Sequence, residues 1–198
     1  MKCILCENYT FAHICKTCQK SFLSPSFSQR KLPNGIDIIS FYKYEEIKEL
    51  LFTKHTDFGF YIYTLLAKLS FKQFAQEFHT KEKYISLAID DTIKSGYSHT
   101  AILNKSLKTY NINPLYNKIR ARNSISYSGK SKIFREQNPR NFQVKKLTSD
   151  NIILVDDIAT TGQTLIQACN KIKEQGKSVS FCLVLTDVSL NPNYAIEN

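Results

Sequence analysis

The stretch NIILVDDIATTGQTL, residues 151–165, decides how the rest of the chain is interpreted. Its first part, NIILV (151–155), is an apolar run of the length of a buried strand, and a helix is expected to begin at about residue 162. Asp156 and Asp157 stand at the end of this strand, and a threonine-rich turn follows them. Ligands of parallel sheets bind at the carboxyl ends of the strands. The stretch therefore predicts a binding edge.

The turn ATTGQT (159–164) has the composition of a phosphate cradle. Backbone N–H groups at the start of a helix attract anions, and Gly162 allows a tight turn and a close approach of the backbone. The two aspartates are unsuited to binding a phosphate, but they can accept hydrogen bonds from the hydroxyls of an attached ribose. The stretch thus predicts a 5-phosphorylated ribose as ligand. The residues expected around it are Asp156, Asp157, Ala159, Thr160, Thr161, Gly162, Gln163 and Thr164.

A solvated turn after a strand is the plainer alternative. It explains the polar residues, but not this order of an apolar run, two acids and Thr-Thr-Gly-x-Thr. A Walker A loop is excluded because the stretch has no Gly-x4-Gly-Lys-Thr sequence. A dinucleotide-binding fingerprint fails as well, since only one glycine is present in residues 151–165. These exclusions favour the ribose-phosphate interpretation.

Strand-like and helical patterns alternate along the chain, which predicts an α/β fold with a mainly parallel sheet flanked by helices. Strands are expected at 36–42, 84–89, 113–116, 151–155 and 178–186. Helices are expected at 45–52, 57–77, 98–110 and about 162–175, with Ser98 as an N-cap and Gly176 at the end of the last helix. A hydrophobic fraction of 42% in 198 residues is enough for a core. Cys169 and Cys182 stand in apolar contexts and are expected in that core.

Residues 1–33 are expected to form a small cysteine finger and a linker, followed by a second domain at 34–198. Two CxxC pairs can bring four thiolates onto one tetrahedral Zn²⁺. A segment of roughly 30 residues cannot build a core alone, so the metal would supply its folding energy. Two disulfides are the alternative, but they need an oxidising compartment. The expected ligands are Cys3, Cys6, Cys15 and Cys18, with His13 as a substitute candidate.

The net charge of +10 is concentrated between residues 117 and 146, where nine basic residues stand beside one acid. This segment has no sustained periodicity and is expected to be a long loop that can include short strands. With Tyr127, Phe134 and Phe142 interleaved, its charge suits backbone contacts and base stacking of single-stranded nucleic acid. The alternative is a loop that closes over the phosphates of the ligand. The candidate nucleic-acid contacts are Lys130, Lys132, Arg135 and Arg140.

The sequence favours a cytoplasmic location. The first ten residues, MKCILCENYT, lack the apolar core and the cleavage pattern of a signal peptide. The most hydrophobic helical stretch, residues 58–71, contains Lys68 and is too short to cross a bilayer. No feature of the chain therefore supports the oxidising compartment that disulfides would need.

Residues 151–165 resemble the phosphoribosyl pyrophosphate (PRPP) binding motif of type I phosphoribosyltransferases. Joined to an N-terminal four-cysteine finger, the motif makes nearly the whole chain similar to the ComF family of bacterial competence proteins, also called ComFC. The resemblance implies a type I phosphoribosyltransferase-like sheet. Further landmarks stand in the order of that family: Lys54, SGYSHTA (95–101), Arg120-Ala-Arg-Asn-Ser124, and Arg135-x-x-Asn138 with Phe142.

The resemblance implies a competence protein required for natural transformation, which handles incoming single-stranded DNA and binds PRPP. Mg²⁺ would be held mainly by the ligand itself, and Lys54 or basic residues of the segment 117–146 would neutralise the pyrophosphate. The implied partner is a DNA translocase or helicase-type ATPase, which would recruit the protein to the inner face of the membrane. The alternative function is an active phosphoribosyltransferase that acts on an unidentified acceptor.

Three departures from the family pattern concern the chemistry. SLAID (86–90) replaces a Pro-Val-Pro-Leu segment whose loop contacts the pyrophosphate, and Tyr127 replaces a glutamine. Thr160 stands where purine-salvage relatives have a carboxylate, so Asp90 or Asp91 would have to act in its place. The sequence therefore assigns no catalytic residue and supports PRPP binding more strongly than turnover.

Overall fold

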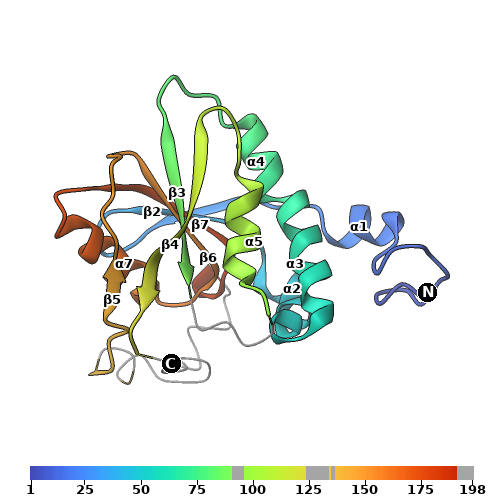
Figure 1. The fold of residues 1–198 in the computed structure, drawn as a ribbon. Helices are drawn as coiled ribbons and strands as arrows, with labels where there is room; N and C mark the ends of the chain where they lie inside the picture. The colour runs from blue at the N-terminus through green and yellow to red at the C-terminus, as the bar shows by residue number, and fades with distance from the viewer. Residues whose placement is uncertain (91–95, 124–133, 135–136, 191–198) are drawn as a thin grey trace.

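The computed structural model describes residues 1–90, 96–123, 134 and 137–190. Within them, seven strands form one sheet in the order β1-β2-β7-β6-β3-β4-β5 (Figure 1). The strands are β1 (Ser28–Lys31), β2 (Asp37–Tyr42), β3 (Tyr84–Asp90), β4 (Ile112–Ala121), β5 (Phe142–Val144), β6 (Ile152–Ala159) and β7 (Val179–Asp187). The five central strands pair in parallel, and each edge strand pairs antiparallel with its neighbour. The mainly parallel sheet expected from the sequence is confirmed.

Helices cover both faces of this sheet. They are α1 (Lys16–Phe22), α2 (Tyr44–Leu51), the 3₁₀ helix η1 (Phe52–His55), α3 (Asp57–Leu69), α4 (Phe71–Glu77), α5 (His99–Ser106), α7 (Gln163–Lys173) and the 3₁₀ helix η2 (Val188–Leu190). α3, α4 and α5 lie on one side of the sheet and α7 on the other (Figure 1). No helix among the described residues has the length and apolar composition needed to cross a membrane.

Alternate residues of β6 belong to two different cores. Ile153 and Val155 pack in the core that contains α2 to α5, whereas Ile152 and Leu154 pack in the core that contains α7. Successive side chains of a strand point to opposite faces. Because both faces are covered, residues Ile152–Val155 of the strand are all apolar, as in buried parallel strands. This double burial fixes the strand whose carboxyl end carries the candidate site.

The helix expected at 57–77 is interrupted at Ser70, so the prediction of one continuous helix was wrong. Ser70 separates α3 from α4. Its hydroxyl donates to the carbonyl oxygen of Leu66 at 2.6 Å, a local bond that bends helices. The expected N-cap Ser98 is confirmed, because its hydroxyl accepts a hydrogen bond from the Ala101 N–H at 3.1 Å.

Two edge strands lie where the sequence suggested loops. β1 lies inside the expected linker, where Ser28 pairs with Ser40 and Lys31 with Asp37. β4 is ten residues long and continues into the basic segment, and β5 lies near the other end of that segment. The segment 117–146 therefore contains strand near both its ends, and the short strands allowed for within it are present. These segments lack a clear alternation of apolar residues, which is the signal that strand prediction uses.

The N-terminal finger packs against the helices that cover the sheet. Ile14 and Leu23 are each 1% exposed and belong to the same core as α3. The ring of His13 contacts the rings of Phe58 and Tyr61 on α3, at centroid distances of 4.8 and 4.6 Å. In Figure 1, α1 and the N-terminus lie beyond α3, at the end of the molecule. The ring of His13 thus joins the finger to α3. Among the described residues, the candidate metal cluster of the finger consists of four cysteines and does not include His13.

Candidate functional site

The strand β6 is longer than expected and leads directly into the threonine turn. Both aspartates lie on the strand, which continues to Ala159, and α7 begins at Gln163. Gly162 is the N-cap of α7, and its φ of +78° lies in the left-handed region that favours glycine. A Cβ atom at this position would lie 2.3 Å from Cδ2 of Leu32. The backbone conformation and the packing both require glycine here.

The loop between β6 and α7 surrounds a small hollow of about 20 Å³. Its lining includes the first turn of α7, where backbone N–H groups attract anions. Thr161 Oγ1 accepts a hydrogen bond from the Gln163 N–H at 3.3 Å, which holds the turn. The lining residues are Asp156, Ile158, Ala159, Thr160, Thr161, Gly162, Gln163, Thr164 and Leu165. The structure thus brings together all the expected loop residues and one of the two aspartates.

Asp157 lies on the other side of β6, inside a buried polar cluster. It is 6% exposed, and its Oδ2 accepts hydrogen bonds from Lys54 Nζ and Tyr63 Oη, both at 3.2 Å. His99 Nε2 lies 3.4 Å from the same oxygen. Oδ1 accepts the N–H of Ile158 at 2.9 Å. One carboxylate therefore connects β6 with η1, α3 and α5.

The charge state of Asp157 follows from these neighbours. Burial by itself would raise the pKa of the carboxyl group, because it disfavours the charged form. Electrostatic interactions with Lys54 and then with His99, together with hydrogen bonds, outweigh burial and hold the pKa of Asp157 well below its usual range. The side chain is therefore an anion throughout the physiological pH range.

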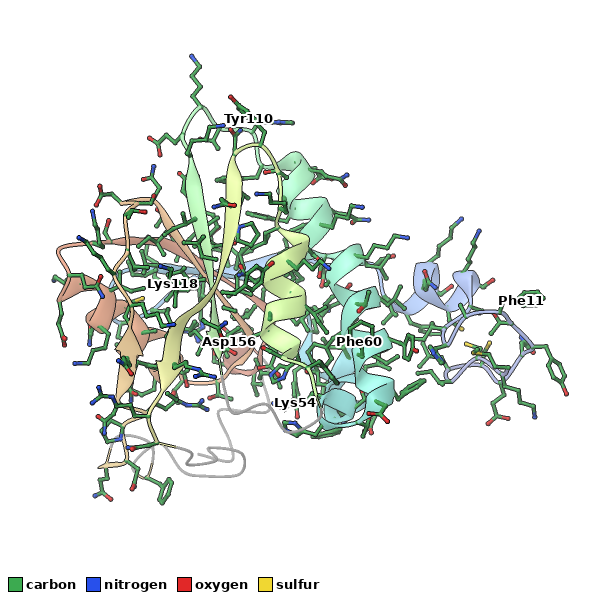
Figure 2. All side chains as sticks on the ribbon, viewed as in Figure 1. Phe11, Lys54, Phe60, Tyr110, Lys118 and Asp156 are labelled. Carbon is green, nitrogen blue, oxygen red and sulfur yellow. The ribbon has the colours of Figure 1, made fainter. Side chains whose placement is uncertain are left out.

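Asp156 has a different environment from its neighbour. It is half-buried and lines the hollow, and its Oδ1 accepts the Asp157 N–H at 2.9 Å. Successive residues of a strand point to opposite faces. Figure 2 shows Asp156 and Lys54 at the same end of the sheet. The two aspartates expected as a joint ribose clamp are therefore not equivalent, because one lines the loop and the other is enclosed by protein groups.

Lys54 is held in place through both its side chain and its backbone. Its Nζ contacts Asp157, and its carbonyl oxygen accepts the hydroxyl of Tyr97 at 2.9 Å. The close approach of α3 to η1 requires Gly59, because a Cβ atom there would lie 2.1 Å from the carbonyl oxygen of Thr53. The side chain of Lys54 remains 29% exposed, so part of it is accessible to solvent.

The sequence did not identify several residues that build this region. Tyr63 is one of many aromatics in its helix, and its bond to Asp157 spans 94 positions of the chain. Arg30 lies in the expected linker, yet it pairs with Asp187 and donates to the carbonyl oxygen of Thr160. The available signal was Asp187, an acid directly after an apolar strand, which places it at the same carboxyl edge as the aspartate pair.

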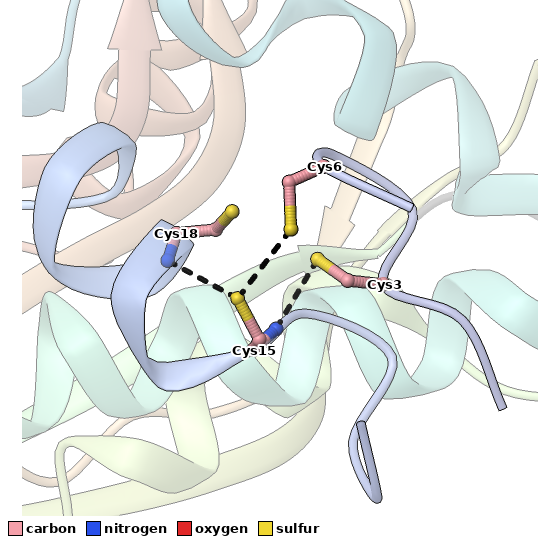
Figure 3. Close-up of side chains that lie close together, drawn as sticks. All are labelled: Cys3, Cys6, Cys15 and Cys18. Atoms are coloured by element: carbon pink, nitrogen blue, oxygen red, sulfur yellow. Dashed lines mark hydrogen bonds between the residues drawn. The ribbon is translucent and has the colours of Figure 1, made fainter. Parts of the chain in front are cut away.

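The four finger cysteines form a cluster that can hold a metal ion (Figure 3). All four Sγ atoms lie within 4.8 Å of one another, and those of Cys6 and Cys15 are 3.8 Å apart. Tetrahedral coordination with Zn–S bonds of about 2.3 Å requires sulfur atoms about 3.8 Å apart. The Cys15 N–H donates to Cys3 Sγ and the Cys18 N–H to Cys15 Sγ, as backbone amides do to thiolates. All six cysteines of the chain are free thiols.

The protonation of this cluster favours a cation. The hydrogen bond from the Cys15 N–H lowers the pKa of the Cys3 thiol to about 6. Burial, followed by the neighbouring Cys6, raises the pKa of the Cys18 thiol. Four thiolates in contact repel one another, so they cannot all ionise unless a cation lies between them. A divalent metal ion removes this conflict.

The candidate nucleic-acid contacts fall mostly outside the described residues. Lys130, Lys132 and Arg135 lie there, together with Tyr127 and Asp91. Arg140 is described, and its backbone N–H donates to Gln167 Oε1 on α7 at 3.0 Å. Phe142 is 5% exposed and belongs to the core under α7. The expectation that Phe142 serves base stacking is therefore wrong, because its ring is buried.

Comparison with known proteins gave two results. A family model described as PRTase-CE matches residues 26–192, which include every strand of the sheet. None of the curated proteins that were compared matches the chain.

Several solved structures of phosphoribosyltransferases are similar to the chain. Adenine phosphoribosyltransferase from Saccharomyces cerevisiae, complexed with an imino-altritol bisphosphate and adenine, is 16% identical, covering 91% of this chain and 94% of its own, with a TM-score of 0.42. Orotate phosphoribosyltransferase from Aeropyrum pernix is also 16% identical, covering 86% and 80%, with a TM-score of 0.39.

Proposed function

Because the chain belongs to the PRTase-CE family, we propose that it binds PRPP together with Mg²⁺ at the carboxyl end of β6. The observation that carries this proposal is the loop 160–164, which lines one hollow with Asp156 at the N-terminus of α7. Helix N-termini with a glycine-containing turn bind phosphate groups. The loop would therefore hold the 5-phosphate of the ligand.

The two aspartates would act differently on this ligand. Asp156 lines the hollow and would accept hydrogen bonds from the ribose hydroxyls. Asp157 is surrounded by donors from the protein, so it would hold Lys54 in place instead. Lys54 would then meet the pyrophosphate. Mg²⁺ would be bound mainly by oxygen atoms of the ligand itself, as is usual for phosphate substrates.

Phosphoribosyl transfer to an unidentified acceptor is the second candidate function, because the same site would hold the donor. An acceptor nucleophile would displace pyrophosphate at the anomeric carbon. Thr160 gives the loop no carboxylate to act as a general base. The side chains of Asp90 and Asp91 lie outside the described part of the structure. Release of pyrophosphate that depends on one added acceptor would support this function over simple binding.

Zn²⁺ is the ion proposed for the cysteine cluster, and its role would be structural. Four thiolates complete a tetrahedral shell and leave no open position for a substrate. Cys3 and Cys18 are buried in the same core as Ile14 and Leu23. The metal would therefore hold the finger against the helices that cover the sheet.

The finer proposal is a competence function of the ComF type. It is supported by the cysteine finger ahead of a PRPP-type loop and by the charge of the segment 117–146. Arg120, Lys145 and Lys146 are exposed at the β4–β5 edge of the sheet. Single-stranded DNA would contact this edge through its phosphates. A DNA translocase or helicase-type ATPase at the inner face of the membrane is the proposed partner.

Isothermal titration calorimetry with PRPP and Mg²⁺ tests the ligand proposal. We expect saturable binding that Asp156→Asn weakens. Asp150→Asn is the matched control, because Asp150 lies just before β6, at the opposite end of the strand, and is 74% exposed. No binding by the unmodified protein, in calorimetry and in a thermal shift assay, would contradict the proposal.

A complementation experiment tests the competence proposal separately. The gene is deleted, and the wild-type, Asp156→Asn and Asp150→Asn proteins are compared in a transformation assay. We expect wild type and Asp150→Asn to restore DNA uptake and Asp156→Asn to fail. Undiminished transformation in the deletion strain would show that the protein has another role, whatever its ligand.

A further inference from the structure

Arg30 connects the edge strand β1 to the loop between β6 and α7. Its Nε and one terminal nitrogen donate to the two carboxylate oxygens of Asp187 at 2.5 and 3.2 Å. The same terminal nitrogen donates to the carbonyl oxygen of Thr160 at 3.1 Å. Asp187 is the last residue of β7, and Thr160 follows the last residue of β6. One guanidinium group therefore ties the loop to the carboxyl end of the neighbouring strand.

This ion pair is largely withdrawn from solvent. The side chain of Arg30 is 21% exposed and that of Asp187 is 1% exposed. Asp187 Oδ1 also accepts the N–H and the hydroxyl of Ser189, at 3.1 and 2.7 Å. Forked bonds between arginine and a carboxylate are stronger and more directional than neutral hydrogen bonds. The carboxylate thus holds the guanidinium in one orientation, and the guanidinium holds Thr160.

The strand β1 and the residue after it also form a wall against the loop. A Cβ atom at Gly162 would lie 2.3 Å from Leu32 Cδ2 and 3.7 Å from a terminal nitrogen of Arg30. Arg30 and Leu32 share one face because they alternate with Lys31, whose side chain is 70% exposed. The loop therefore rests on residues that stand about 130 positions earlier in the chain.

The bond from Arg30 fixes the direction of one peptide group in the loop. In a trans peptide the C=O and the following N–H point to opposite sides, and no cis peptide occurs among the described residues. The Thr160 carbonyl points to Arg30, so the Thr161 N–H points away from β1. An anion in the loop needs N–H groups around it. A rotated peptide would present a carbonyl oxygen to the anion instead.

We propose that Arg30, held by Asp187, is a positioning residue for the 5-phosphate of the ligand. It keeps the loop in the form that accepts a phosphate monoester and does not itself contact the ligand. Because Asp187 offsets the positive charge of Arg30, Arg30 acts by fixing the geometry of the loop more than by long-range attraction of the phosphate. Lysine cannot replace it fully, since an ammonium group lacks the planar fork that contacts Asp187 and Thr160 together. This inference rests on the proposed PRPP site.

The test measures the affinity of three probes by calorimetry: PRPP with Mg²⁺, ribose 5-phosphate, and pyrophosphate with Mg²⁺. Arg30→Met should bind the first two roughly tenfold more weakly and pyrophosphate unchanged, a loss of about 1.4 kcal/mol for each phosphoribosyl ligand. Arg30→Lys should lie between wild type and Arg30→Met. Lys31→Met is the matched control on the same strand, and it should bind all three probes like wild type.

Each remaining outcome counts against a stated claim. Unchanged binding of ribose 5-phosphate and PRPP by Arg30→Met, with normal wild-type binding, overturns the role of Arg30 alone. An equal loss for pyrophosphate shows a general structural role, and it also overturns the inference. If Arg30→Met does not fold, as judged by its melting curve, the comparison of Arg30→Lys with wild type decides. Absence of binding by the wild-type protein overturns the proposed function, and the inference with it.

Discussion

Lys54 Nζ lies 3.2 Å from Asp157 Oδ2, although 103 positions of the chain separate the two residues. The same oxygen accepts the hydroxyl of Tyr63 and lies 3.4 Å from His99 Nε2. Three elements that cover the sheet therefore converge on one carboxylate of β6. Asp157 therefore has a structural role in connecting these elements to the sheet as well as a place in the site. This distinguishes it from its neighbour Asp156.

Asp157→Asn should destabilise the protein strongly. The substitution keeps the shape but removes the negative charge that pairs with Lys54, and breaking a buried ion pair costs about 3 kcal/mol. The free energy of unfolding, measured by urea denaturation, should fall by this order. The exposed control Asp150→Asn should change it by less than about 0.5 kcal/mol. Equal stability of the two variants would contradict the central role of Asp157.

Asp156→Asn should weaken ligand binding and leave the stability of the protein nearly unchanged. Because the side chain lines the hollow and is half-buried, its loss should change the free energy of unfolding by less than about 1 kcal/mol. The affinity for PRPP with Mg²⁺ should fall roughly tenfold or more, since an amide replaces a charged acceptor of the ribose hydroxyls. Calorimetry and denaturation on the same protein sample separate the two effects. A large loss of stability without loss of affinity would reverse the proposed roles of the aspartates.

Stability should decline in acid partly because of Asp157. Burial raises the pKa of this group, but the interactions with Lys54 and His99 lower it by more than burial raises it. The pKa of Asp157 in the folded protein therefore lies well below the unfolded value of about 3.9. The stabilisation is present above the unfolded pKa and is lost as the pH falls towards the folded pKa. Urea denaturation between about pH 5 and 2 should show a shallower decline for Asp157→Asn than for wild type. Parallel curves would show that the carboxylate has no depressed pKa.

Gly162→Ala should disturb the loop more than a positive φ alone explains. Gly176→Ala is the matched control, because Gly176 has a φ of +70° but a Cβ atom there would meet no neighbouring atom within 4 Å. The control should cost about 1 kcal/mol, and Gly162→Ala should cost at least about 1 kcal/mol more because of the clash with Leu32. The double variant with Leu32→Ala should recover part of the binding of ribose 5-phosphate. An equal loss of stability for the two glycine variants would mean that the Leu32 side chain moves aside without an energetic penalty.

Removal of the metal should release the finger from the protein core. We expect one Zn²⁺ per chain by elemental analysis, and a chelator or Cys3→Ser should lower the melting temperature because Ile14 and Leu23 lose their support. Cys169→Ser is the control, since Cys169 lies on the buried face of α7 and outside the cluster. It should keep the full metal content. A metal-free protein with an unchanged melting temperature would contradict a structural metal.

The features that could be predicted from the sequence are those set by neighbouring residues. The run from strand to turn to helix at 151–165 has its determinants in order, and the paired cysteines stand at fixed spacings. Such signals depend on local conformation and ligand geometry, so no knowledge of the fold is needed to use them. The parallel sheet followed from the same local patterns.

The features that were missed depend on which elements the fold brings together. Arg30 contacts Thr160 only because β1 joins the edge of the sheet, and the polarity of its segment suggested a linker. Phe142 stands among basic residues in the sequence, but antiparallel pairing of β5 with β4 turns its ring into the core. Burial is a property of the assembled sheet, and a residue's immediate neighbours do not specify it.

The position of β1 has a practical consequence for truncated forms of the protein. A chain that begins at residue 34 would keep the aspartates and the threonine turn, but it would lose Arg30 and Leu32. Asp187 would then be a buried anion without its counter-ion. β2 would become an exposed edge strand of the sheet, which could pair with a second molecule. Such a fragment should aggregate, so we expect that the finger and the sheet cannot be exchanged as independent modules by a cut at residue 34.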